Sequence, residues 1–170
     1  MGHESVAELV ARLELEPHPE GGWYREVYRA VESITASALP TRYSGERVFA
    51  TSIYFLLTSE SFSSLHRIAS DEQWHYHLGS PLTVHQITPC GDYQPLLLGP
   101  DLVQGHRFQA VVPHDNWFGA TVEEPGGYAL VGCTVSPGFD FADFELANRS
   151  QLLKQFPQHA ELIKRLTRLS

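Results

Sequence analysis

Cysteine is nearly absent from this chain, which carries only Cys90 and Cys133 among its 170 residues. The two thiols form neither a Cys-x-x-Cys pair nor the dense spacing of a small disulfide-bonded domain. The sequence therefore predicts a reduced compartment, and we expect a cytoplasmic protein. Because free cysteine is among the most often buried residue types, we expect both side chains to serve as plain packing.

Basic residues and long apolar runs are scarce as well. Lysine and arginine together number 12 against 20 aspartates and glutamates, which gives a formal net charge of −8. A chain with this charge repels phosphate backbones, so we expect no nucleic acid partner. No apolar run approaches the roughly 20 residues that span a bilayer, and no secretory leader pattern is present. We expect no membrane partner either.

The chain is instead rich in turn residues at short intervals. Its 11 prolines and 13 glycines are spread along the sequence, and its length suits one buried core, so we expect a single domain over residues 1–170. Short runs rich in β-branched and aromatic residues lie between the turns. They cover residues 23–29, 49–57, 63–68, 72–77, 82–87, 94–98, 107–112, 118–122 and 128–135. Such a series predicts an all-β sandwich or barrel.

Helical patterns occur near the two ends of the chain. A capping box at residues 5–8, followed by apolar residues at helical spacing, predicts a first helix. Asn148 or Ser150 is expected to cap a second helix, and Pro157 to begin a third. The apolar residues of the third are Leu162, Ile163, Leu166 and Leu169. Residues 30–47 are polar and irregular, and we expect them to form a mobile loop.

Histidines gather in the middle of the sequence, where six of the nine lie between His66 and His114. Within this group, Ile68 lies two residues after His66, Glu72 lies four residues after Ile68, and Gly79 lies seven residues after Glu72. Alternate residues of a strand share a face, so His66 and Ile68 point the same way, and Glu72 is expected to return on the neighbouring strand. The spacing predicts an imidazole and a carboxyl facing one cavity.

This spacing resembles the first motif of the cupin superfamily, G-x5-H-x-H-x3-4-E-x6-G. Over almost its whole length the chain is also similar to a little-characterised branch of that superfamily. The matching stretches are residues 17–22 (PHPEGG), 24–26 (YRE), 70–75 (SDEQWH), 112–113 (VP), 117–120 (WFGA), 132–140 (GCTVSPGFD) and 143–145 (DFE). The resemblance implies a double-stranded β-helix, the jelly-roll barrel of the cupins, with short N- and C-terminal helices. It also implies an architecture like that of the sugar-nucleotide epimerases of this fold, which usually form dimers.

The metal ligands of a typical cupin are only half present. Such a site normally uses three histidines and a glutamate, but Ile68 replaces the second histidine of the first motif. In the second motif, G-x5-P-x-G-x2-H-x3-N, the histidine position falls on Phe118. Only His66 and Glu72 remain, so we expect no bound metal and no other cofactor.

His75 and His77 offer an alternative His-x-His pair. Strand alternation places both on the face opposite Glu72, so a site that combines the three requires a bulge. A position on the outer face or at a subunit contact is the simpler interpretation.

Without a metal, His66 and Glu72 form a candidate acid/base pair, because imidazole titrates near neutral pH and a carboxylate stabilises its charged form. The leading hypothesis is a metal-independent isomerase or epimerase of a small sugar-like or carbonyl compound, with His66 as the base. A buried polar pair in a non-catalytic ligand-binding cupin is an alternative that Ile68 and Phe118 favour. A metal-dependent oxygenase or isomerase with a substitute ligand is another.

Around this pair we expect an aromatic, partly dry pocket for a small molecule. The candidate binding residues are Arg25, Tyr54, Trp74, Tyr76, Gln109 and Phe118. Arg25 either binds an anionic group of the ligand or forms a structural ion pair with Glu26. Because its edge is rich in aromatic residues, the strand at 23–29 is expected to lie near the contact of a homodimer.

Overall fold

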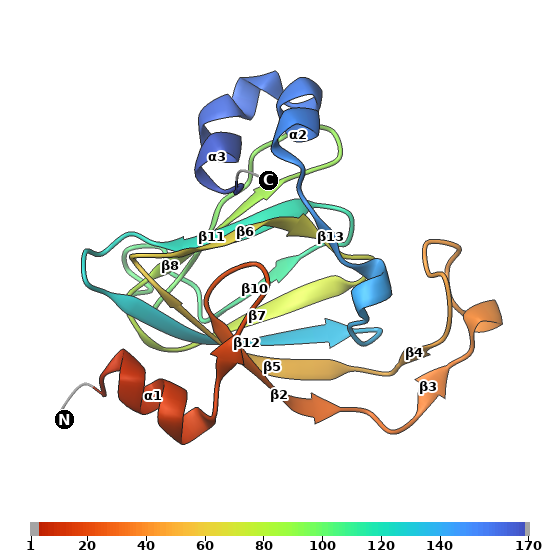
Figure 1. The fold of residues 1–170 in the computed structure, drawn as a ribbon, viewed down its shortest axis with the longest axis horizontal. Helices are drawn as coiled ribbons and strands as arrows, with labels where there is room; N and C mark the ends of the chain where they lie inside the picture. Colours follow the sequence, from red (N-terminus) through yellow and green to blue (C-terminus); the bar gives the residue numbers. More distant parts are fainter. Residues whose placement is uncertain (1–3, 169–170) are drawn as a thin grey trace.

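A computed structural model describes residues 4–168 and shows two antiparallel sheets that face each other (Figure 1). The larger sheet has the strand order β1 (Glu16–Pro17), β2 (Trp23–Arg29), β5 (Thr51–Thr58), β12 (Tyr128–Ser136), β7 (Asp71–Gly79) and β10 (Gln109–Val112). The smaller has the order β13 (Glu145–Leu146), β6 (Phe62–Arg67), β11 (Trp117–Val122), β8 (Leu82–Ile87) and β9 (Leu96–Leu98). The all-β jelly-roll predicted from the sequence is confirmed.

Helices cover the outer faces of both sheets (Figure 1). Helix α1 (Val6–Leu13) packs Leu9 against Leu56 and Leu130 of the larger sheet. Helices α2 (Arg149–Gln155) and α3 (Ala160–Arg165), joined by the 3-10 turn η3 (Pro157–His159), lie against the smaller sheet. In residues 4–168 no helix is long and apolar enough to cross a membrane.

The sequence signals at the helix ends are confirmed. The side chain of Ser5 accepts a hydrogen bond from the backbone of Glu8, and Glu8 accepts one in return, which completes the capping box. Asn148 caps α2 through a bond from the backbone of Gln151. Leu169, expected in the last helix, lies outside the described residues.

Two local expectations are wrong. Residues 30–47 are not irregular throughout, because β3 (Ser33–Ile34) pairs with β4 (Arg47–Val48) around the short 3-10 helix η1 (Ala36–Ala38). Cys133 is buried as expected, but Cys90 is exposed in a turn and contributes no core packing.

Between the sheets lies a core whose largest buried side chains are Phe55, Trp74 and Phe118. These rings meet edge to face, with 5.9 Å between the centroids of Phe55 and Trp74 and 6.4 Å between those of Trp74 and Phe118. Two rings of this aromatic layer, Phe55 and Trp74, also line the candidate site.

Candidate functional site

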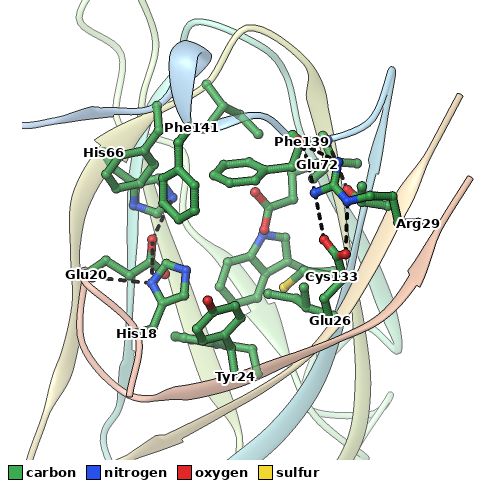
Figure 2. Close-up of a pocket in the computed structure, with 17 residues that line it drawn as sticks. His18, Glu20, Tyr24, Glu26, Arg29, His66, Glu72, Cys133, Phe139 and Phe141 are labelled. Carbon is green, nitrogen blue, oxygen red and sulfur yellow. Dashed lines mark hydrogen bonds and ion pairs between the residues drawn. The ribbon is translucent and has the colours of Figure 1, made fainter. Parts of the chain in front are cut away.

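A cavity of about 250 Å³ lies between the two sheets, and His66 and Glu72 both line it, as their spacing predicts (Figure 2). The way in which they meet differs from the expectation. The strands β6 and β7 do not pair with each other, because β6 belongs to the smaller sheet and β7 to the larger. His66 and Glu72 therefore reach the cavity from facing sheets rather than from neighbouring strands.

His66 is 3% exposed, and both of its ring nitrogens contact protein atoms. Nδ1 lies 2.8 Å from the backbone oxygen of Ser64. Because a carbonyl oxygen can only accept, Nδ1 carries a proton. Nε2 lies 3.1 Å from Oε2 of Glu20, so these two atoms share a proton. Burial lowers the pKa of His66 and raises the pKa of Glu20, so it disfavours the charged form of both groups.

Glu20 is a buried residue of the cavity that the sequence pattern did not single out. It is 6% exposed, and its Oε1 accepts a 2.8 Å hydrogen bond from the hydroxyl of Ser63. His18 approaches the same carboxyl from the other side, with 3.7 Å between Nδ1 and Oε2. Figure 2 shows His66, Glu20 and His18 in a row along one wall of the cavity.

The loop that carries Glu20 can approach β5 and β6 so closely because two glycines follow it. Gly21 has a φ of +115°, and a Cβ there would overlap the carbonyl oxygen of Phe62. Gly22 has a φ of +76°, and its Cβ would lie 2.6 Å from the carbonyl oxygen of Leu56. The PHPEGG stretch, which supported the family resemblance, therefore also carried the signal for this part of the site.

The carboxyl of Glu72 is only weakly satisfied by the protein around it. Its side chain points into the open space in Figure 2, and it is 8% exposed. Its hydrogen-bonding neighbour among the described residues is the thiol of Cys133. Burial raises the pKa of Glu72 to about 7, although the nearby His66 acts in the opposite direction. A carboxyl that titrates near neutral pH can both take up and release a proton under physiological conditions.

An ion pair lies at another side of the cavity. Arg29 donates to Glu26 through two hydrogen bonds of 2.9 and 2.7 Å and also donates to the backbone oxygen of Phe139 at 3.3 Å. Strand alternation alone would separate the two side chains, since they are three residues apart. The register of β2 shifts between Glu26 and Tyr28, and this bulge turns Arg29 toward the cavity.

Three phenylalanines form an aromatic wall, which we define as Phe139, Phe141 and Phe144. Their ring centroids are 5.0 to 6.2 Å apart, and the ring of Phe144 lies 5.3 Å from that of His66. These residues follow the last long strand in an irregular segment, so strand alternation gave no signal for them.

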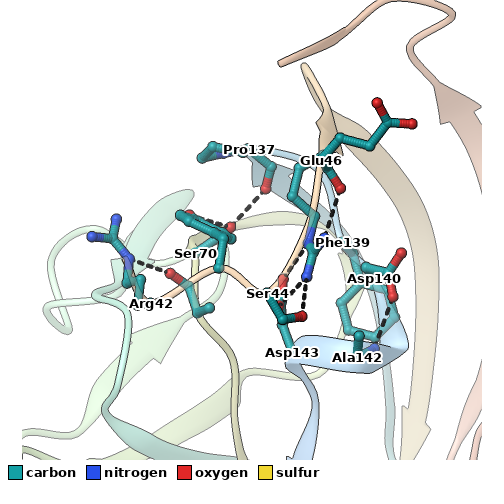
Figure 3. Close-up of polar contacts among 12 residues, drawn as sticks. Arg42, Ser44, Glu46, Ser70, Pro137, Phe139, Asp140, Ala142 and Asp143 are labelled. Atoms are coloured by element: carbon teal, nitrogen blue, oxygen red, sulfur yellow. Dashed lines mark hydrogen bonds and ion pairs between the residues drawn. The ribbon is translucent and has the colours of Figure 1, made fainter. Parts of the chain in front are cut away.

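A buried ion pair outside the cavity holds the aromatic wall in place (Figure 3). Arg47 donates to the carboxylate of Asp143 through bonds of 2.7 and 2.5 Å, and both side chains are less than a tenth exposed. The backbone of Phe139 adds a 3.0 Å bond to the hydroxyl of Thr51.

Two of the six predicted binding residues lie at the site. Trp74 lines the cavity and is 1% exposed, and its Nε1 has no hydrogen-bond partner among the described residues. Phe118 does not line the cavity but lies behind His66, with 4.1 Å between the ring centroids. It therefore supports the imidazole rather than contacting a ligand.

The other four predicted binding residues lie away from the cavity, and we leave them out of the site. Arg25 alternates with the inward Tyr24, so it points outward and pairs with Glu14 rather than Glu26. Tyr54 faces outward for the same reason and packs in the cluster beneath α1.

The positions of the remaining two also have local causes. Tyr76 keeps the inward face of Glu72 and Trp74 and packs against the core between the sheets farther along β7, and its hydroxyl donates to the backbone oxygen of Gly79. Gln109 is exposed on the edge strand β10.

The ligand positions of a typical cupin metal site do not fit a metal here. Ile68 and Phe118, at two of the four positions, are apolar and almost completely buried. His75 contacts the hydroxyl of Thr134 at 3.2 Å and His77 lies against the ring of Tyr54, so neither reaches Glu72. In residues 4–168, no three histidine, cysteine or acidic side chains are grouped so as to hold a metal ion.

Comparisons with known proteins agree with this architecture. The family model described as "Cupin superfamily (DUF985)" matches residues 7–147. A structural-genomics protein from Shewanella oneidensis is 39% identical, with a TM-score of 0.89 over 99% of this chain and 100% of that one. A hypothetical protein from Leishmania major is 38% identical, with a TM-score of 0.88 over 98% and 100%. No curated protein matches the chain significantly.

A more distant likeness concerns the fold alone. A mutant of oxalate decarboxylase from Bacillus subtilis is 16% identical, with a TM-score of 0.53 over 88% of this chain and 36% of that one.

The buried carboxyl of Glu72 is expected to destabilise the folded protein above neutral pH. Its pKa rises from 4.5 to about 7 on folding, so the unfolded chain ionises first and stability falls as the pH rises through this window. The difference corresponds to roughly 3 kcal/mol above pH 7. Glu72→Gln should therefore raise the free energy of unfolding by up to that amount at pH 8, and change it little at pH 4, as measured by urea denaturation.

The exposed Glu124 provides the control for this measurement. Glu124→Gln should change the free energy of unfolding by less than about 0.5 kcal/mol at either pH. A Glu72→Gln variant that is no more stable than the wild type at pH 8 would contradict the raised pKa.

Proposed function

Because the chain belongs to the cupin superfamily, in the branch described as DUF985, we propose that its cavity binds a small sugar-like or carbonyl compound. We further propose that the protein isomerises or epimerises this compound by proton transfer, without a metal. The observation that carries the proposal is the approach of Glu72 and the Glu20–His66 pair to one enclosed space from facing sheets. Two separately held acid/base groups are what such a reaction requires.

The geometry assigns the two groups different roles. Glu72 has no strong partner, so its carboxylate is the base that takes a proton from the carbon beside the substrate carbonyl. The electron pair moves to the carbonyl oxygen, which receives the proton shared by Oε2 of Glu20 and Nε2 of His66. For an α-hydroxy carbonyl compound, Glu72 then returns the proton to the former carbonyl carbon, and the neighbouring hydroxyl, which becomes the new carbonyl, gives its proton back to the pair, which completes the isomerisation. His66, which the sequence suggested as the base, acts here from the acid side.

The surroundings of the cavity support this chemistry. The aromatic wall and the side chains of Ile53, Phe55 and Trp74 make the lining largely apolar, which strengthens charge interactions and hinders side reactions with water. The unpartnered Nε1 of Trp74 is a donor that a substrate oxygen can satisfy. A volume of about 250 Å³ suits a molecule smaller than a sugar nucleotide.

A non-catalytic binding protein is the second candidate. Both nitrogens of His66 already have protein partners, in Ser64 and Glu20, as expected of a buried polar pair that only satisfies itself. The two functions differ in whether a bound carbonyl compound exchanges hydrogen with solvent.

Hydrogen exchange tests the proposal directly. Small keto sugars and keto acids are first screened by thermal shift, and those that bind are incubated in deuterated buffer and followed by NMR. The wild type should catalyse exchange of the hydrogen beside the carbonyl. Glu72→Gln and His66→Ala should each slow it about a hundredfold or more, the scale of a positioned acid/base group.

His75→Ala is the matched control, because it removes an imidazole from the outer face of the strand that carries Glu72. It should leave exchange unchanged. If compounds bind and none exchanges with the wild type, the protein is a binding module and the catalytic proposal fails.

We also propose a homodimer in which the outer side of β2 takes part. Val27 and Tyr28 of this strand are 50% and 55% exposed and form an apolar surface, which a second copy can cover. Light scattering at micromolar concentration should give twice the monomer mass, and Val27→Asp combined with Tyr28→Asp should halve it. A wild type of monomer mass would refute the dimer.

A further inference from the structure

Charge is distributed unevenly over the cavity lining. Three carboxyl side chains, from Glu20, Glu26 and Glu72, face it, and among the described residues the only arginine or lysine that lines it is Arg29. The two histidines of the lining are His18 and His66, and burial lowers the pKa of both, which keeps the rings neutral. The cavity therefore has a formal excess of acid.

The single cation of the lining is already occupied. The guanidinium of Arg29 is held by two bonds to Glu26 and a third to the backbone oxygen of Phe139. An anionic ligand would have to displace Glu26 and leave its carboxylate without a partner. The neutral His66 offers no free donor either, because Ser64 and Glu20 occupy its nitrogens.

Glu72 is in the opposite situation. It is more than nine-tenths buried, points into the cavity in Figure 2, and has only the weak thiol donor of Cys133 beside it. When ionised, Glu72 has no charged partner bonded to it among the described residues, and a cationic donor would compensate it. The rest of the lining is rich in aromatic rings, including Tyr24 and the aromatic wall, and ring faces attract organic cations.

From this arrangement we propose that the ligand of the cavity carries an ammonium group, which binds Glu72 while the body of the ligand lies against the aromatic lining. For the proposed reaction this makes the substrate class a small amino sugar or amino ketone rather than a keto acid, with one oxygen of Glu72 accepting from the ammonium group and the other acting as the base. The proposal rests on the proposed function only in assigning the ligand to the same cavity. Charge selectivity is a property of binding, so it can be tested without turnover.

Three probes of nearly equal shape separate the possibilities: cyclohexylammonium, cyclohexanol and cyclohexanecarboxylate. Titration calorimetry or ligand-observed NMR at pH 7.5, up to about 50 mM probe, gives their relative affinities. The ammonium ion should bind at least about tenfold more tightly than the carboxylate, the scale of one charged hydrogen bond. Tighter binding of the carboxylate, equal binding of the two ions, or no binding of the ammonium ion would overturn the proposal.

Variants assign the selectivity to its residues. Glu72→Gln should weaken ammonium binding about tenfold and leave cyclohexanol binding within about threefold of the wild type, whereas the exposed control Glu124→Gln should change neither. Glu26→Gln should free Arg29 and strengthen carboxylate binding at least about threefold. If Glu72→Gln leaves the ammonium affinity unchanged, the assigned contact is wrong.

The failure of this inference and that of the proposed reaction can be told apart. The cyclohexyl probes contain no carbonyl group and cannot undergo exchange, so they report on binding alone. Ammonium selectivity without hydrogen exchange on any amino ketone or amino sugar would retain the binding site and reject catalysis. Exchange on keto sugars without ammonium selectivity would retain catalysis and reject the ammonium site.

Discussion

The enclosure of ionisable groups between two facing sheets is the constraint on which the site depends. The larger sheet supplies Glu72 and the smaller sheet supplies His66, and neither strand pairs with the other. They therefore face the same cavity only when the barrel is closed. Desolvation in that closed space brings the pKa of Glu72 to about 7 and disfavours the charged forms of Glu20 and His66. The same exclusion of water that stabilises the aromatic core thus gives the acidic groups their chemistry.

Much of the fold could be predicted because each strand has a clear local pattern. The runs at 82–87 and 128–135 coincide with β8 and β12 to within one residue, since alternation and flanking turns are local properties. Strand pairing is not a local property, so the sequence placed His66 and Glu72 on neighbouring strands. In the structure, turn residues between β6 and β7 lead the chain from one sheet to the other.

Bulges and loops explain what else the sequence did not reveal. Period-two alternation fails where the register shifts, which is why Arg29 faces the cavity. Glu20 arrives from a loop far from His66 in the chain, and its position depends on the close approach that Gly21 and Gly22 permit. A glycine pair marks such a loop in a sequence but does not show where in the fold it docks.

The anchoring of the aromatic wall has a consequence for how this barrel can diversify. Asp143 is fixed to Arg47 outside the cavity, while the three phenylalanine rings project from the same short segment toward the ligand space. Support and recognition are therefore assigned to different residues of that segment. Changes at Phe139, Phe141 or Phe144 can reshape the cavity while the anchor keeps the backbone in place. Related chains, or a protein engineer, can thus retune ligand preference through these three positions without rebuilding the scaffold.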